Sequence, residues 1–179
     1  MPILGVIASG ISGNLYSASY ESIATVTGNG SATSLTFSSI SATYQHLQIR
    51  GIAKTASDTV FYLRFNADTG SNYSRHSLYG NGTTAATLGD ANMTEIGQIR
   101  ASTTTSIYSG SVIDILDYKD TNKYKTVRLL TGCDFNGSGI VMLSSGSWRN
   151  TNAITSITLR CDTAFDSNST FALYGIKGA

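Results

Sequence analysis

Charged side chains are scarce in this chain. They make up 13% of its 179 residues, about half the share that is typical of soluble domains. Lys and Arg number 12 against 11 Asp and Glu, so the net charge is +1. No basic run is present, which argues against nucleic acid as a partner because phosphates need a cationic surface. The low charge also gives little electrostatic protection against association, so this surface suits contact with other copies or other proteins.

Proline, cysteine and long apolar runs are also scarce. Pro2 is the single proline. The apolar run at residues 2–11 is shorter than the roughly 20 residues of a membrane span and lacks the cationic region that opens a secretory signal. We therefore expect no membrane segment. Cys133 and Cys161 are too far apart in sequence for a CxxC pair. Two small buried residues on separate strands, or a disulfide between neighbouring strands, both fit the sequence.

Alternation with a period of two is the main pattern that is present. It is clearest at residues 44–80, where strands are predicted at 45–53 and 59–66 and a third strand ends at Gly80. A period of two indicates a strand with one buried face and one solvated face. Residues 67–72 between the second and third strands are turn formers. No segment longer than about ten residues shows the 3.6-residue period of a helix.

The rest of the chain predicts further short strands separated by Gly and Asn. Residues 20–27 and 34–40 read as a hairpin around an Asn-Gly turn, and residues 83–91 read as a loop. Apolar residues throughout 108–118 favour a strand that is buried on both faces. The remaining strands are predicted at 93–100, 125–132, 139–144, 153–161 and 169–176. This pattern predicts an all-β fold, an antiparallel β-sandwich or jelly roll of about ten short strands.

We expect two parts, an N-terminal apolar arm at 1–13 and a single β-sandwich domain at 14–179. The apolar residues of the arm are Ile3, Leu4, Val6, Ile7 and Ile11. The arm either folds back along the domain as an edge strand or packs on a neighbouring subunit. The sequence leaves both interpretations open, and the reason for the second is that strand addition satisfies backbone groups and apolar side chains together.

Candidate chemical sites are few and weak. The turn at 134–139 places Asp134, Asn136 and Ser138 at the spacing of a calcium loop, but Ser145 stands where the closing Glu is needed. An ordinary turn is the better interpretation, and no metal or cofactor is predicted. His46 and His76 have no partner at a metal-ligand spacing, so we interpret them as solvated or interface residues.

Trp148 and Arg149 form the last candidate. Exposed aromatic rings can stack on sugars or anchor protein interfaces. Because Trp148 stands just before a predicted strand, a ring that packs over one end of the sandwich is the better interpretation, and a sugar platform is the alternative. No nucleophile elbow of the GxSxG type is present, so we predict no catalytic residues and no enzyme.

Motifs along nearly the whole chain resemble one family. They are the opening MPILGVIASGISG, HLQIRG at 46–51, RFNADTGSNYSRHSLYG at 64–80, IDILDY at 113–118, TGCDFNGSG at 131–139, GSWRNTNAITSITL at 146–159 and FALYGIKG at 171–178. Together they resemble small virion-associated proteins of tailed bacteriophages. These motifs shape a fold and carry no shared catalytic residues.

The resemblance implies a non-enzymatic virion structural protein, either a tail or fibre component or a capsid decoration (cement) protein. It implies other virion proteins as partners and a location in the virion, on the tail or the capsid exterior, after synthesis in the host cytoplasm. The charge-poor surface and apolar arm suit a homo-oligomer, for which a trimer is our first expectation. The alternative is a carbohydrate-binding adhesin module on the virion that recognises a host surface glycan.

Overall fold

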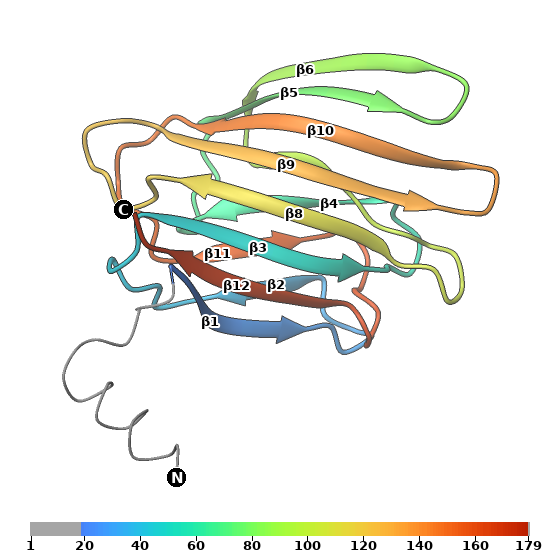
Figure 1. Ribbon diagram of the computed structural model, residues 1–179, viewed down its shortest axis with the longest axis horizontal. Helices are drawn as coiled ribbons and strands as arrows, with labels where there is room; N and C mark the ends of the chain where they lie inside the picture. The colour runs from blue at the N-terminus through green and yellow to red at the C-terminus, as the bar shows by residue number, and fades with distance from the viewer. Residues whose placement is uncertain (1–18, 179) are drawn as a thin grey trace, which may run out of the picture.

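A computed structural model describes residues 19–178 of the chain. Two antiparallel sheets face each other (Figure 1). The larger sheet contains, in spatial order, β1 (Tyr20–Thr27), β12 (Thr170–Ile176), β3 (His46–Ala53), β8 (Ser109–Leu116), β9 (Lys125–Asp134), β10 (Gly139–Trp148), β5 (Tyr73–Gly80) and β6 (Ala85–Met93). The smaller sheet contains β2 (Ser34–Phe37), β11 (Ile157–Arg160), β4 (Val60–Phe65) and β7 (Ile96–Arg100). The all-β sandwich predicted from the sequence is confirmed.

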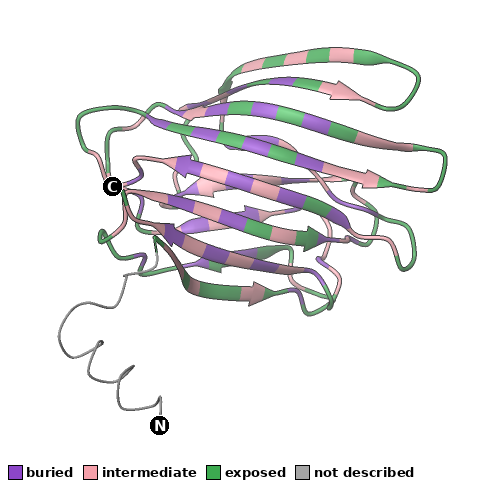
Figure 2. Ribbon diagram, in the orientation of Figure 1, coloured by how far each residue is buried: buried purple, intermediate pink, exposed green. Residues whose placement is uncertain are grey.

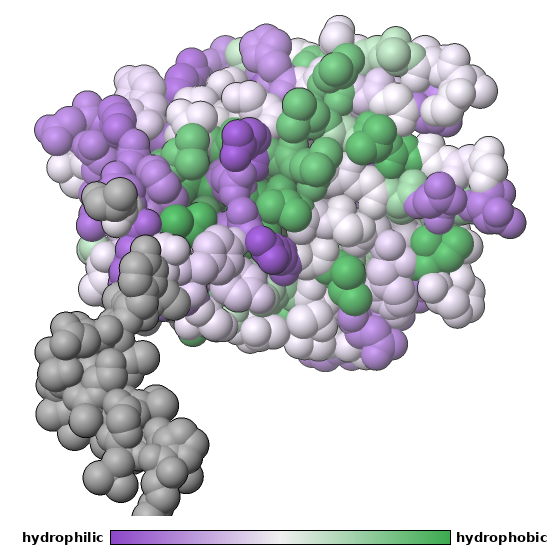
Figure 3. Space-filling model, viewed as in Figure 1, coloured by the Kyte–Doolittle hydropathy of each residue, from purple (hydrophilic) through white to green (hydrophobic). Residues whose placement is uncertain are grey.

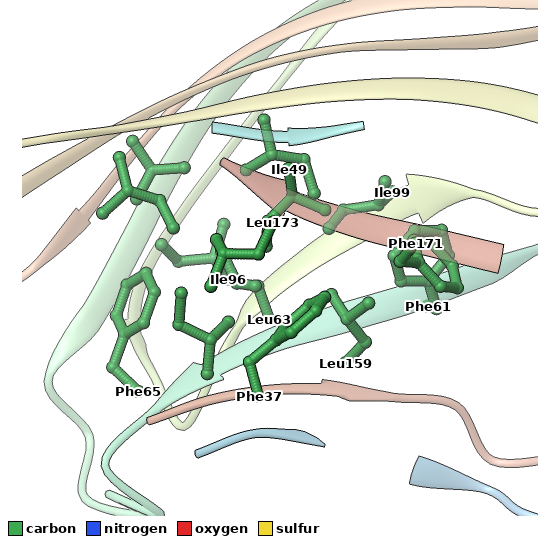
Figure 4. Packing of buried hydrophobic residues seen from close by; sticks show 14 of the residues in the cluster. Phe37, Ile49, Phe61, Leu63, Phe65, Ile96, Ile99, Leu159, Phe171 and Leu173 are labelled. Carbon is green, nitrogen blue, oxygen red and sulfur yellow. The ribbon is translucent and has the colours of Figure 1, made fainter. Parts of the chain in front are cut away.

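The core lies between the two sheets. Buried and exposed residues alternate along the strands of both (Figure 2), as the period of two predicts. The larger sheet contributes Leu47, Ile49, Ile113, Ile115, Val127 and Leu173 to the core, and the smaller sheet contributes Phe37, Phe61, Leu63, Phe65, Ile96 and Leu159. Side chains from the two sheets meet in this layer (Figure 4).

Three phenylalanines fill one part of this core. The ring of Phe61 lies edge-on to the rings of Phe165 and Phe171, with centroids 5.8 and 5.4 Å away. Gly51 allows this packing, because a Cβ there would lie 2.1 Å from the Phe171 ring. Glycine in β3 therefore lets an aromatic ring of the neighbouring strand cross over the backbone.

Most predicted strands are confirmed, and their bounds shift by a few residues at most ends. The predicted loop at 83–91 is wrong, because most of it forms β6, the edge strand of the larger sheet. No residue of β6 is buried, so the strand shows no clear alternation of apolar and polar residues.

Two further predictions on the strands are wrong. Residues 20–27 and 34–40 do not pair as a hairpin, because β1 pairs with β12 and β2 pairs with β11 in the other sheet. The Asn29 carboxamide still stabilises the predicted turn by accepting hydrogen bonds from the backbone of Ser31 and Ala32. The strand within 108–118 is buried on one face only, since no layer of the described chain covers the outer side of β8.

The predicted arm at 1–13, with Ile3, Leu4, Val6, Ile7 and Ile11, lies outside the described residues. Both cysteines lie inside them. Cys133 is on β9 and Cys161 directly follows β11 in the other sheet, and both thiols are free. The structure thus shows two free thiols and not the disulfide that the sequence also allowed. No helix in the described residues is long and apolar enough to span a membrane.

Candidate functional site

The outer surface of the smaller sheet is polar. Thr36 and Thr158 face each other across β2 and β11 with their hydroxyl oxygens 3.0 Å apart. Beside them, Glu95 accepts hydrogen bonds from Arg64 at 3.0 Å and from Arg160 at 2.7 Å. These carboxylate contacts raise the pKa of Arg160. Thr36 is exposed on this face, whereas Glu95 is only 7% exposed and pairs with both arginines.

The outer face of the larger sheet is apolar. The strand registers place Val112, Leu130, Leu143 and Leu78 side by side in one row across β8, β9, β10 and β5. Ile52 and Val141 lie in the next row. We call these six side chains the apolar patch. Five of them are 47–57% exposed, and Figure 3 shows hydrophobic atoms gathered in the middle of this face.

Glycines make this face hollow. Gly110, Gly132 and Gly80 occupy the same row as Ile52 and Val141. The absence of their side chains leaves a groove of about 630 Å³ between β12 and β10, lined by Ile52, Gly110, Val112, Leu130, Gly132, Val141 and Ala172 among others. We call it the glycine groove. A second hollow of about 530 Å³ shares Gly132 and Val141 with it and continues to Gly80.

Polar side chains border the patch on one side. Asp114 accepts hydrogen bonds from Arg128 at 2.8 Å and from Gln48 at 2.6 Å. Arg50 donates to Gln48 at 2.7 Å, and its guanidinium lies 5.3 Å from the centroid of the Tyr20 ring. Arg128 is paired with the Asp114 carboxylate, whereas Arg50 contacts only the uncharged Gln48 and the rings of Tyr20 and Tyr174 among these residues. The border therefore carries a net positive charge.

The structure separates the two candidate histidines. His46 begins β3, and its Nδ1 accepts a hydrogen bond from the backbone of Asp117 at 2.9 Å. His76 is exposed on β5, four strands away in the sheet order. It lines a hollow of about 500 Å³ beside Leu78 and Leu143. His76 therefore borders the apolar patch, whereas His46 stabilises the connection after β8.

Trp148 is buried, as the packed interpretation favoured from the sequence expects, and the possible role as a surface ligand residue is excluded. Its side chain is only 1% exposed and packs against the ring of Tyr73, with centroids 6.3 Å apart and planes 19° apart. Its Nε1 donates to Asp68 at 2.8 Å. The packed interpretation is the one observed, since the indole is part of the core. Burial also raises the pKa of Tyr73 to about 12.

Arg149 remains at the surface but has partners within the chain. Its guanidinium donates to the carbonyl oxygen of Ser71 at 2.9 Å and to the side chain of Asn92 at 2.6 Å. It thus ties the connection between β4 and β5 to the end of β6. These contacts give Arg149 a structural role that its position in the sequence did not indicate.

The turn at 134–139 joins β9 to β10. Asp134 accepts a hydrogen bond from the backbone of Asn136 at 2.7 Å, and Phe135 donates to the carbonyl oxygen of Ser138 at 2.8 Å. Asn136 and Gly137 have positive φ angles of 60° and 102°, as expected in a tight turn. Within residues 19–178, no group of three or more His, Cys, Asp or Glu side chains could hold a metal ion.

The apolar patch was not predicted from the sequence, although a signal for it exists. Leu129 and Leu130 are consecutive, as are residues 140–143 in Ile-Val-Met-Leu. Neighbouring residues of a strand point to opposite faces, so such runs require both faces of β9 and β10 to be apolar. That pattern usually indicates a strand covered on both sides. Here the inner side is covered and the outer side is open.

Comparison of the chain with protein-family models, with curated proteins and with solved structures finds no match. The geometry of the outer face is therefore the main guide to function.

Proposed function

We propose that this chain is a non-enzymatic structural protein of a tailed-bacteriophage virion, a tail or fibre component or a capsid decoration protein, which assembles through protein–protein contacts. The observation that carries the assembly role is the apolar patch on a sheet face that neither the smaller sheet nor another strand of residues 19–178 covers. The phage assignment comes from the resemblance of the sequence motifs.

The size of the uncovered face supports a protein partner. Seven strand spacings of about 4.8 Å give a width of about 34 Å for the eight-stranded sheet. Seven residues along β12 give a height of about 20 Å. The resulting area of about 700 Å² is close to the roughly 800 Å² that each partner buries in a standard interface. The apolar patch lies within this face, and contiguous exposed apolar patches mark interaction sites more often than free surface.

The contrast between the two outer faces supports the same role. The smaller sheet presents threonines and the Glu95 ion pairs, while the larger sheet presents Leu, Ile and Val. A general shortage of polar residues would have made both faces apolar. The asymmetry instead favours a protein that contacts its neighbours through one side and remains in contact with solvent through the other.

The test is made on purified particles of the phage that encodes the chain. Mass spectrometry should find the chain in washed virions, and a cryo-EM map should contain repeated density that fits the sandwich. Density over the capsid lattice would identify a decoration protein, and density on the tail would identify a tail or fibre component. Absence of the chain from washed particles would overturn the proposal.

Glycan binding is the second candidate function. The observation that favours it is a pair of half-buried aromatic rings on the outer face, Tyr20 and Tyr174, with centroids 5.2 Å apart. Gln48 and Asp114 lie beside them as hydrogen-bonding groups. A glycan array with the intact chain tests this role. Loss of binding in Tyr174→Ala would support it, and no binding to any glycan would exclude it for the array's sugars.

A further inference from the structure

We propose that Asn136, at the tip of the β9–β10 hairpin (Figure 1), is a site of spontaneous deamidation in the folded protein. The chain contains three Asn-Gly pairs, which begin at Asn29, Asn81 and Asn136, and each pair is followed by Ser or Thr. Their local sequences alone therefore predict similar rates of deamidation, whereas the folded structure separates them. This inference goes beyond the proposed function and does not depend on it.

Deamidation needs no co-reactant except water. The backbone nitrogen of the glycine attacks Cγ of the preceding asparagine and a C–N bond forms. The C–N bond of the carboxamide breaks, and its nitrogen leaves as ammonia with the proton that the glycine nitrogen loses. Water then opens the cyclic imide at either carbonyl, which produces aspartate or isoaspartate. Glycine favours the attack, because it has no side chain and its backbone is permissive. The reaction thus requires a free glycine N–H and a carboxamide that can move toward it.

Hydrogen bonds restrain both reacting groups of the first pair. Oδ1 of Asn29 accepts from the backbone N–H of Ser31 at 2.9 Å and from that of Ala32 at 2.7 Å. The nitrogen that would attack, on Gly30, donates to the carbonyl oxygen of Phe165 at 3.0 Å. These three hydrogen bonds oppose ring closure, because they hold the carboxamide over the turn and occupy the glycine N–H.

The second pair is restrained in a similar way. Oδ1 of Asn81 accepts hydrogen bonds from the backbone N–H groups of Thr83 at 3.1 Å and Thr84 at 2.8 Å. The backbone N–H of Asn81 donates to the carbonyl oxygen of Thr84 at 3.2 Å. Ring closure rotates the peptide that follows Asn81 and moves its carboxamide, so these three hydrogen bonds oppose it.

The third pair lacks these restraints. In the part of the chain that the structure describes, the Asn136 side chain has no hydrogen-bond partner, and the backbone N–H of Gly137 donates to no group. Both residues are exposed. The hydrogen bond across the Asn136–Gly137 peptide runs from the backbone of Phe135 to the carbonyl oxygen of Ser138 at 2.8 Å. Rotation of this peptide for ring closure therefore opposes one backbone hydrogen bond, and both reacting groups are free.

The product changes the charge of the protein. Lys and Arg number 12 against 11 Asp and Glu, so one new carboxylate brings the net charge from +1 to zero. It would stand two residues from Asp134, beside the hollow of about 530 Å³ that Asp134 and Gly137 help to line. A net charge near zero favours association, so the age of a preparation should influence its self-association.

The experiment is peptide mapping by mass spectrometry of the full-length chain during incubation at physiological temperature and mildly alkaline pH. Incubation in H₂¹⁸O labels the products that form in the tube. Two additional hydrogen bonds of typical strength lower a rate by about fivefold or more, so we expect Asn136 to react faster than Asn29 and Asn81 by at least about that factor. Both aspartate and isoaspartate should appear at position 136, and ion-exchange chromatography should show an acidic form that grows at the same rate.

Two controls separate the effect of the fold from that of local sequence. In concentrated urea the three sites should react at similar rates, because the hydrogen bonds are lost. Asn136→Gln should remove the main acidic form, since glutamine closes a six-membered ring and reacts far more slowly. Asn81→Gln is the matched variant and should leave that form unchanged. The comparison of the three sites in the natural chain does not depend on either variant.

Three results would overturn the inference. They are equal rates at the three sites in the folded chain, faster reaction at Asn29 or Asn81 than at Asn136, and an intact Asn136 in the folded chain under conditions in which it reacts in urea. None of them bears on whether the chain is found in washed virions.

Discussion

The ammonium of Lys125 donates a hydrogen bond to the carbonyl oxygen of Thr151 at 3.0 Å, in the interior of the protein. The side chain is fully buried and also donates to the carbonyl oxygens of Asp120 and Lys123. Burial lowers the pKa of Lys125. The three carbonyls belong to the β8–β9 connection and to the segment after β10, so one side chain holds two connections together.

Replacing Lys125 by Met should lower the free energy of unfolding by about 2–4 kcal/mol, because three buried carbonyl oxygens lose their donor. Urea denaturation measures the change. Lys119→Met, at a half-exposed position of the same connection, is the control and should change stability by less than about 0.5 kcal/mol. Equal stabilities of the two variants would contradict this role of Lys125.

Trp148 is the single tryptophan of the chain, so its fluorescence reports directly on the core. Its burial against Tyr73 and Phe65 predicts a blue-shifted emission maximum and weak quenching by acrylamide. Trp148→Ala should destabilise the protein by about 3–5 kcal/mol through cavity formation. Trp148→Phe should cost less, because it keeps an aromatic ring in the core, although it removes the hydrogen bond to Asp68 and leaves a smaller cavity. Emission like that of a tryptophan in water would show that the indole is exposed.

Leu129 and Leu130 are sequence neighbours with opposite environments. Leu129 is 2% exposed and Leu130 is 51% exposed. Leu129→Ala should lower stability by about 2–5 kcal/mol, whereas Leu130→Ala should change it by less than about 0.5 kcal/mol. Analytical ultracentrifugation should show weaker self-association of the Leu130 variant only. A strongly destabilised Leu130→Ala would mean that the outer face is covered within one chain.

Asp166 stabilises the fold in a pH-dependent way. Hydrogen bonds from Lys54 at 2.8 Å, from the backbone of Asn168 at 3.0 Å and from Tyr108 at 2.7 Å hold the pKa of its carboxyl group well below the ordinary value. The unfolded chain binds its proton near pH 3.9. The stabilisation of the fold by the Asp166 carboxylate is therefore complete above that pH, and it is lost as the pH falls toward the folded-state pKa of Asp166.

Asp166→Asn should therefore be less stable than the natural chain at pH 7, and the difference should shrink as the pH falls below about 4. Thermal unfolding between pH 2 and pH 7 measures it. Asp162→Asn, at an exposed carboxylate after β11, provides the comparison. A difference that is independent of pH would exclude the charge of Asp166 as the cause.

Deleting residues 1–13 should leave a folded domain that no longer joins the particle. The buried hydrophobic residues of the described chain lie between Leu35 and Leu173, so the deletion removes none of them. Circular dichroism and thermal unfolding test the fold, and copurification with virions tests incorporation. A deletion variant that still joins the particle would exclude the arm as an assembly element.

Local sequence was sufficient to predict the strands. Alternation at Leu47, Ile49 and Gly51 fixed which side chains of β3 point inward, and these are the residues that face the core. Alternation failed at β6, where no residue is buried and apolar and polar residues do not alternate. Local sequence also failed to show that β1 and β2 belong to different sheets. An Asn-Gly turn reverses the chain, but it does not decide which strands the two flanking segments pair with.

The sequence by itself determined an all-β chain with little charge, because a period of two and a supply of turn residues are local properties. Only the tertiary structure decided that Trp148 is buried, that His46 and His76 are separated, and that Leu130 is exposed beside the buried Leu129. These outcomes depend on the pairing of strands distant in sequence and on the unequal size of the sheets. The smaller sheet covers one face of the larger one, and no second sheet within residues 19–178 covers the other.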